Sequence, residues 1–251
     1  MDILTVFLLA TFTALATGLG ALPVSWIGPE RVRRYEPFLL GVTAGVMTAA
    51  SIGLLVDPIR EDKLIPLVVG IVLGVAFLFA AQRLLEGREA SEDPDVGRHI
   101  TRSILVFAVL FVHSLPEGFA LGSAWASTVA GIGVFVFIAI SLQNVPEGTA
   151  TAIPMAQAGY SRLRQFGAAV GTSLPQPVGA VIAFVLVEQV NALLPWSLGF
   201  AAGAMFALVV ADLLPEAYGS GDGRRGMATG GVVSALVAMA LLALVLSLAV
   251  G

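Results

Sequence analysis

The chain has 251 residues, of which 57% are hydrophobic and 12% are charged, and its net charge is −4. A soluble globular domain carries about 25% charged residues, so this composition excludes a soluble enzyme. The chain has no cysteine, which excludes disulfides and thiolate metal sites, and it has no basic run that would point to a nucleic acid partner.

Eight apolar segments are long enough to cross about 30 Å of hydrocarbon, which indicates an all-α, polytopic protein of the lipid bilayer. We expect transmembrane helices near residues 3–22, 37–56, 64–82, 102–125, 129–157, 166–188, 196–217 and 228–250. The N-terminus opens Met1-Asp2 without the positive flank of a cleavable signal, so the first segment should remain as a span.

Positive charge is distributed unevenly over the connections between these segments. Alternate connections hold 11 of the 13 Lys and Arg residues, including the longest connection, about residues 83–101. These residues are Arg31, Arg33, Arg34, Arg83, Arg88, Arg98, Arg102, Arg162, Arg164, Arg224 and Arg225. The other side has only Arg60 and Lys63. The positive-inside rule therefore places the Arg-bearing connections in the cytoplasm and both termini outside it.

The second and seventh segments resemble each other. Residues 41–49 match residues 199–207 at five positions, Gly41/Gly199, Ala44/Ala202, Gly45/Gly203, Met47/Met205 and Ala49/Ala207. The two segments run in opposite directions, as expected for an inverted repeat with a binding site near the midplane. The alternative is that these small residues only let helices pack closely.

Three acidic residues lie well inside predicted spans, and no Lys or Arg does. They are Glu117, Glu147 and Asp212. A carboxylate at this depth is costly unless its charge is compensated. Since no basic side chain is available there, a proton, a bound cation or water must compensate it.

Two of these carboxylates occur in the same local motif. The fourth segment contains His-Ser-Leu-Pro-Glu-Gly at 113–118, and the fifth contains Gln-Asn-Val-Pro-Glu-Gly at 143–148. In each motif the first residue and the glutamate are four apart and share one helical face, and the proline is expected to bend the helix. Together the faces offer an imidazole, an amide oxygen and two carboxylates, a set suited to zinc, iron or manganese. The alternative is a kinked helix whose glutamate is protonated and hydrogen-bonded.

Asp212 and Glu216 form a second acidic face near the predicted cytoplasmic end of the seventh segment. Asp212 is the deeper of the two. We interpret it as a candidate metal-pathway residue, with an ordinary helix-end acid as the alternative for Glu216.

The paired Pro-Glu-Gly motifs and the eight spans resemble the ZIP (Zrt/Irt-like) family of divalent metal transporters, in its short prokaryotic form. The resemblance covers essentially the whole chain. It implies a single transmembrane transporter domain over residues 1–251, a repeat of spans one to three in spans six to eight, and a metal site between spans four and five.

By position, the resemblance makes His113, Glu117, Gln143 and Glu147 ligands of the principal metal, joined by the thioether of Met47. Gln143 stands where the family commonly has histidine. For Met47, the alternative is ordinary core packing.

Many family members bind a second metal beside the first. The corresponding positions here are Ser114, Asn144 and Gln176, which are all neutral. Without an added anionic ligand, a second divalent ion would meet uncompensated repulsion, so we expect one metal. The alternative for Asn144 and Gln176 is hydrogen bonding between helices.

The resemblance implies transport of Zn²⁺, or of Fe²⁺, Mn²⁺ or Cd²⁺, into the cytoplasm by alternating access, in the cell membrane. A homodimer is compatible with it. Two other functions stay open: a metal-binding sensor or scaffold that does not transport, and an intramembrane metallohydrolase, although the His-Glu-x-x-His motif of many such enzymes is absent.

Overall fold

The computed structural model describes residues 1–89, 98–219 and 223–250, and every regular element in these ranges is a helix. Within these ranges, eight helical segments are long and apolar enough to cross a membrane, which confirms the predicted number. Helices cover both ends of the predicted connection 83–101, and its middle, 90–97, lies outside the described residues.

Five of the spans are single α-helices. These are α4 (Glu36–Arg60), α5 (Leu64–Glu89), α6 (Arg98–Ala126), α7 (Ile132–Gln157) and α12 (Arg224–Val250). Helices α6 and α7 stay continuous through Pro116 and Pro146, the prolines of the two motifs. Each proline removes one backbone hydrogen bond without ending its helix.

The other three spans are interrupted. The first comprises α1 (Ile3–Leu19) and α2 (Ala21–Ile27), and α3 (Pro29–Arg33) follows it. The sixth comprises α8 (Arg162–Thr172) and α9 (Pro175–Gln189). The seventh comprises a 3₁₀ turn (Asn191–Leu193), α10 (Leu194–Leu208), a π-helical turn (Val209–Leu213) and α11 (Leu214–Tyr218).

Proline accounts for two of these interruptions. Helix α9 begins at Pro175, because the missing N–H costs nothing at the first helical position. Pro215 cannot donate a hydrogen bond to the residue four before it, and the turn that precedes it widens into the π-helix, which contains Asp212.

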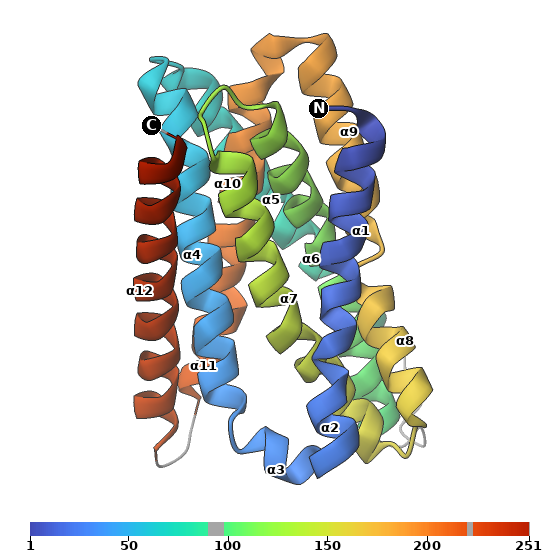
Figure 1. The fold of residues 1–251 in the computed structure, drawn as a ribbon. Coiled ribbons are helices and arrows are strands. Elements are labelled where there is room, and N and C mark those ends of the chain that lie inside the picture. The colour runs from blue at the N-terminus through green and yellow to red at the C-terminus, as the bar shows by residue number, and fades with distance from the viewer. Residues whose placement is uncertain (90–97, 220–222, 251) are drawn as a thin grey trace.

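The helices pack as two groups. In the first, the α4 group, α4 contacts α10 and α12, and α10 contacts α5. In the second, the α6–α7 group, α6 and α7 contact each other, and α1 and α9 pack against them. Contacts of α4 with α7 and of α10 with α6 join the groups. The two chain termini lie at one end of the bundle, and α2 and α3 lie at the other (Figure 1).

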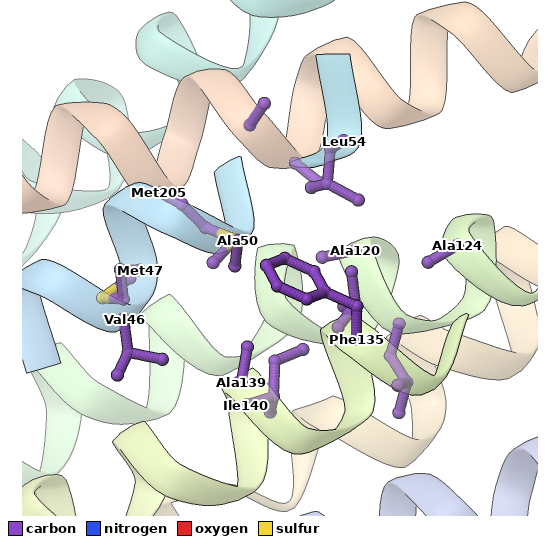
Figure 2. Packing of buried hydrophobic residues seen from close by; sticks show 14 of the residues in the cluster. Val46, Met47, Ala50, Leu54, Ala120, Ala124, Phe135, Ala139, Ile140 and Met205 are labelled. Atoms are coloured by element: carbon purple, nitrogen blue, oxygen red, sulfur yellow. The ribbon is translucent and has the colours of Figure 1, made fainter. Parts of the chain in front are cut away.

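Buried apolar side chains fill the space where α4, α6 and α7 meet (Figure 2). We call this set the apolar layer: Met47, Ala50, Leu54, Ala120, Ala124, Phe135, Ala139 and Ile140. All are buried, and each lies on the side of the motif glutamates that leads toward the α6–α7 connection, except Met47, which begins the layer.

The glycine that ends each Pro-Glu-Gly motif allows a close helix contact. A Cβ on Gly118 would collide with the backbone carbonyl of Gln176 on α9, and a Cβ on Gly148 would collide with the carbonyl of Thr17 on α1. Only glycine permits these approaches. The glycines therefore bring α1 and α9 against the helices that contain the two glutamates.

Replacing Gly148 by alanine should lower stability, because the added methyl group has no room against the α1 backbone. Overpacking of this kind costs about 1–3 kcal/mol. The unfolding temperature of the purified protein in detergent measures the effect. Gly230→Ala on α12 is the matched control: no atom lies within 4 Å of its added Cβ, so a gain in helix propensity should leave stability equal or higher. Equal losses in both variants would contradict the close-approach explanation.

Candidate metal centre

Glu117 lies at the middle of α6 with 1% of its surface exposed, and both its carboxylate oxygens accept hydrogen bonds from amides. Gln143 of α7 donates from Nε2 to Oε1 at 2.7 Å. Gln176 of α9 donates from Nε2 to Oε2 at 2.5 Å. Neutral donors from two other helices thus hold the carboxylate in place.

The amide of Gln176 is itself held in one orientation. Its Oε1 accepts hydrogen bonds from Thr13 Oγ1 and from Asn144 Nδ2, each at 3.0 Å. Asn144 Nδ2 also donates to the carbonyl of Thr13 at 2.6 Å. Since two donors occupy the amide oxygen, the NH₂ group must face Glu117. Thr13 and Gln176 are 0% and 1% exposed, so this network excludes bulk water.

Glu147 of α7 is 7% exposed, and its carboxyl group lies near that of Glu117. Unlike Glu117, it also lines a cavity of about 600 Å³. The two motif glutamates are therefore neighbours, and one of them faces an open space.

Several of the polar residues singled out from the sequence line this cavity. Its ionisable lining residues are Glu36, His113, Glu147, Asp212 and Glu216, with no Lys or Arg among the described lining residues. It reaches from the ends of α4 and α11, at Glu36 and Glu216, to His113 and Glu147 in the interior. This is an acidic passage from one end of the bundle to the glutamate pair.

Asp212 and His113 face each other across part of this cavity. His113 Nε2 lies 3.9 Å from Asp212 Oδ2, and the two side chains are 4% and 36% exposed. Gln82 of α5 donates from Nε2 to the same oxygen at 2.6 Å. Asp212 thus lies beside His113, the first residue of the α6 motif, and the amide of Gln82 holds it there.

Two predicted ligands have a buried atom without a hydrogen-bond partner. Within the described ranges, only four buried side-chain nitrogen or oxygen atoms lack a partner: Ser51 Oγ, His113 Nδ1, Trp125 Nε1 and Gln143 Oε1. His113 and Gln143 are the first residues of the two motifs. A buried acceptor left unpaired costs about 1–3 kcal/mol, and a cation would remove that cost.

Met47 of α4 is 0% exposed and shares a small void of about 10 Å³ with His113 and Met205. It also belongs to the apolar layer, so its contacts are compatible with both of its predicted roles.

The predicted ligands do not form one compact cluster. In the described part of the chain, no three His, Asp or Glu side chains gather closely enough to hold a metal ion. Glu117 is turned toward the amides, and His113 is turned toward Asp212. Ser114 does not join the network but donates to the carbonyl of Thr172 at 2.8 Å. Sequence patterns did not identify Thr13, one of several threonines in the first apolar run, or Gln82, at the end of the third run.

The model of the family described as ZIP Zinc transporter matches residues 83–247 of the chain. The zinc transporter GufA of Myxococcus xanthus is 31% identical, covering 94% of this chain and 95% of the relative. The zinc transporter ZupT of Corynebacterium glutamicum is 30% identical, covering 94% and 96%. A putative zinc transporter of Arabidopsis thaliana is 34% identical over 87% of this chain, which spans only 35% of that longer protein.

The match to the family model covers well over half of the chain, and the bacterial relatives are aligned over nearly their whole length. The chain therefore belongs to the ZIP family of zinc transporters.

Proposed function

We propose that this protein imports a divalent transition metal, with zinc as its first candidate, by exposing a site between α6 and α7 alternately to the two sides of the membrane. The observation that carries the proposal is the pair of buried glutamates. Glu117 and Glu147 lie next to each other, and no Lys or Arg pairs with either among the described residues. Their two charges match one divalent ion.

The proposed ligands are the two glutamates, His113, Gln143 and, from α4, Met47. The unpaired atoms of His113 and Gln143 support this set, because both are buried acceptors that belong to the motif positions beside the glutamates. Binding requires side-chain rotations that turn His113 toward the glutamates and present Gln143 Oε1 to the ion. A mixed nitrogen and oxygen set suits zinc, and Fe²⁺, Mn²⁺ and Cd²⁺ are further candidates.

The acidic cavity supports transport toward the cytoplasm. It ends near Glu36, which follows the Arg-rich residues 31–34, and the positive-inside rule assigns that end to the cytoplasm. The conformation is then one in which the site is open to the cytoplasm. Asp212, fixed beside His113, lies on the route along which a released ion leaves.

The helix contacts support an inverted repeat. A Cβ added at Gly41 or Gly45 of α4 would collide with α12. A Cβ added at their repeat counterparts, Gly199 and Gly203 of α10, would collide with α5. Likewise, Gly148 approaches α1 while Gly118 approaches α9. Each of these contacts has an equivalent when spans one to three are exchanged with spans six to eight, as a repeat that relates those two sets of spans requires.

Membership of a family of transporters excludes the intramembrane metallohydrolase, because ZIP proteins are carriers and not enzymes. The family and the eight spans also make this a multi-pass protein of the cell membrane. Metal flux into sealed proteoliposomes distinguishes a carrier from a sensor that binds metal without moving it.

The formation of a homodimer stays a prediction.

Replacing either motif glutamate by glutamine should abolish flux, because each change removes half of the charge that neutralises the ion. We expect zinc uptake by proteoliposomes with Glu117→Gln or Glu147→Gln to fall to the level of empty vesicles, while the purified variants remain folded. Glu188→Gln, at an exposed position of α9, should keep wild-type uptake. Wild-type uptake by either motif variant at saturating zinc would rule out the site.

Replacing His113 by alanine should impair zinc transport more than manganese transport, because imidazole favours the softer ion. We expect at least a tenfold larger loss for zinc when both ions are measured on the same vesicles. Equal losses would show that His113 is structural.

The network around Gln176 supports a single bound metal. Its NH₂ group, oriented by Thr13 and Asn144, already donates to Glu117 Oε2, and the resemblance gives this residue's position to a ligand of a second metal. We expect one zinc per chain by elemental analysis, and a second partly occupied position in Gln176→Glu, which adds an anion there. Two fully occupied metals in the unmodified chain would contradict this stoichiometry.

A further inference from the structure

Asp57 is a buried carboxylate to which the proposed metal site assigns no role. It lies near the end of α4 and is 4% exposed. Ser127 donates from Oγ to Oδ2 at 2.5 Å, and Thr128 donates from Oγ1 to Oδ1 at 3.4 Å. Among the residues that the structure describes, no Lys or Arg lies within ion-pair distance of it. In the described part of the chain, two hydroxyl groups thus hold this side chain.

We propose that Asp57 is a positioning residue for transport: it ties α4 to the α6–α7 connection and keeps the metal site closed on that side while the acidic cavity is open. We call Asp57, Ser127 and Thr128 the Asp57 clasp. The proposal rests on the proposed function, since closure matters only in a carrier.

The clasp lies at the opposite end of the bundle from the acidic cavity. Asp57 follows Met47 by ten residues on α4, and Ser127 follows Glu117 by ten residues on α6 and its connection. At 1.5 Å per residue, both lie about 15 Å beyond the site. The cavity extends the other way, toward Glu36 at the start of α4. Figure 1 shows the α6–α7 connection at the end of the bundle where the termini lie.

Between the clasp and the site lies the apolar layer (Figure 2). Ala50 and Leu54 of α4 pack there with Ala124 and Phe135 from α6 and α7, all buried. A cavity of about 500 Å³ beside Val129 and Phe135 includes none of the proposed ligands in its lining. The described structure therefore has a packed apolar barrier on this side and an open acidic passage on the other.

The clasp joins the two helix groups. Asp57 belongs to the α4 group, and Ser127 and Thr128 lie in the connection of the α6–α7 group. A second tie of the same kind joins Ser123 of α6 to Ser197 of α10, whose hydroxyl oxygens are 2.5 Å apart. Opening the site on this side requires the groups to separate, so both ties must break.

The chemistry of the clasp makes it reversible. Hydroxyl donors hold a carboxylate only moderately better than water does, so when the groups separate, water can replace Ser127 and Thr128 at a moderate cost. An ion pair would leave a second charge to be hydrated, and apolar packing gains nothing from water. The Asp57 clasp thus fixes the closed position without preventing the open one.

The chain contains no cysteine, so a disulfide can be placed across the clasp without background. In the variant Asp57→Cys with Ser127→Cys, oxidation should join α4 to the α6–α7 connection. We expect zinc flux into proteoliposomes to fall at least tenfold on oxidation and to recover on reduction with dithiothreitol. A second pair, Ser123→Cys with Ser197→Cys, tests the same closure in case the first variant folds poorly. We expect the same loss of flux on oxidation and the same recovery on reduction.

The matched control lies within one helix group. The hydroxyl oxygens of Thr17 and Ser173 are 2.7 Å apart. Thr17 lies in α1 and Ser173 between α8 and α9, and these helices pack against α6 or α7. The oxidised variant Thr17→Cys with Ser173→Cys should keep its flux. Flux that persists in both oxidised pairs across the groups would overturn the proposal, and so would an equal loss in the control.

A second readout does not depend on transport. Ala139 is 0% exposed in the apolar layer, and a cysteine there should react slowly with a membrane-impermeant thiol reagent. Adding Ser127→Ala, which removes one hydrogen bond to a charged group, should raise the labelling rate by about tenfold. An unchanged rate would refute the role of the clasp, whereas absence of zinc flux in the unmodified chain would refute the proposed function instead.

Discussion

Two carboxyl groups in an apolar interior with no basic side chain beside them are the constraint on which the rest of this structure depends. An isolated charge at that depth costs several kcal/mol, so the surrounding helices must either compensate it or leave room for something that does. The glycines of the two motifs bring α1 and α9 close enough for Gln176 and Thr13 to reach the site. The acidic cavity then gives one of the two glutamates a route to the outside of the bundle.

The polar residues around the glutamates are amides and hydroxyls. Such neutral groups can orient a carboxylate by hydrogen bonding without neutralising its charge. An Arg or Lys at the position of Gln176 would hold Glu117 more firmly, but it would also neutralise the charge that we assign to metal binding in the proposed site. An amide donor fixes the carboxylate and leaves most of its charge in place. The same reasoning applies to Gln82, which positions Asp212 without cancelling its charge.

The sequence was sufficient to predict the eight spans, because lipid requires about 20 apolar residues for each crossing and this requirement appears directly in the hydropathy. It also identified Glu117 and Glu147 as neighbours, because their motifs lie on consecutive antiparallel spans. Contacts between distant segments were not predictable. Thr13 and Gln176 are separated by 163 residues, and Gln82 and Asp212 by 130. Whether such side chains meet depends on helix rotation and spacing, which hydropathy does not encode.

Local backbone irregularity was the other unpredicted feature. Pro175 and Pro215 were visible in the sequence, but one begins a new helix and the other follows a π-helical turn. Neighbouring helices decide between these outcomes, because they determine where the displaced backbone can go. Ser114 shows the same dependence on neighbouring helices. Its hydroxyl group donates to a backbone carbonyl of the adjacent segment, and the sequence alone did not predict this contact.

The neutral amide shell around Glu117 also has an electrical consequence. In the proposed site, one bound divalent ion would balance the charges of the glutamate pair; without the ion, two negative charges would remain unless protons take its place. Moving a charge across the whole membrane potential changes its energy by about 2.3 kcal/mol per 100 mV. In the proposed carrier, the membrane potential would therefore act chiefly on the return step without metal, and the number of protons that the glutamate pair takes up decides whether that step moves two negative charges, one or none.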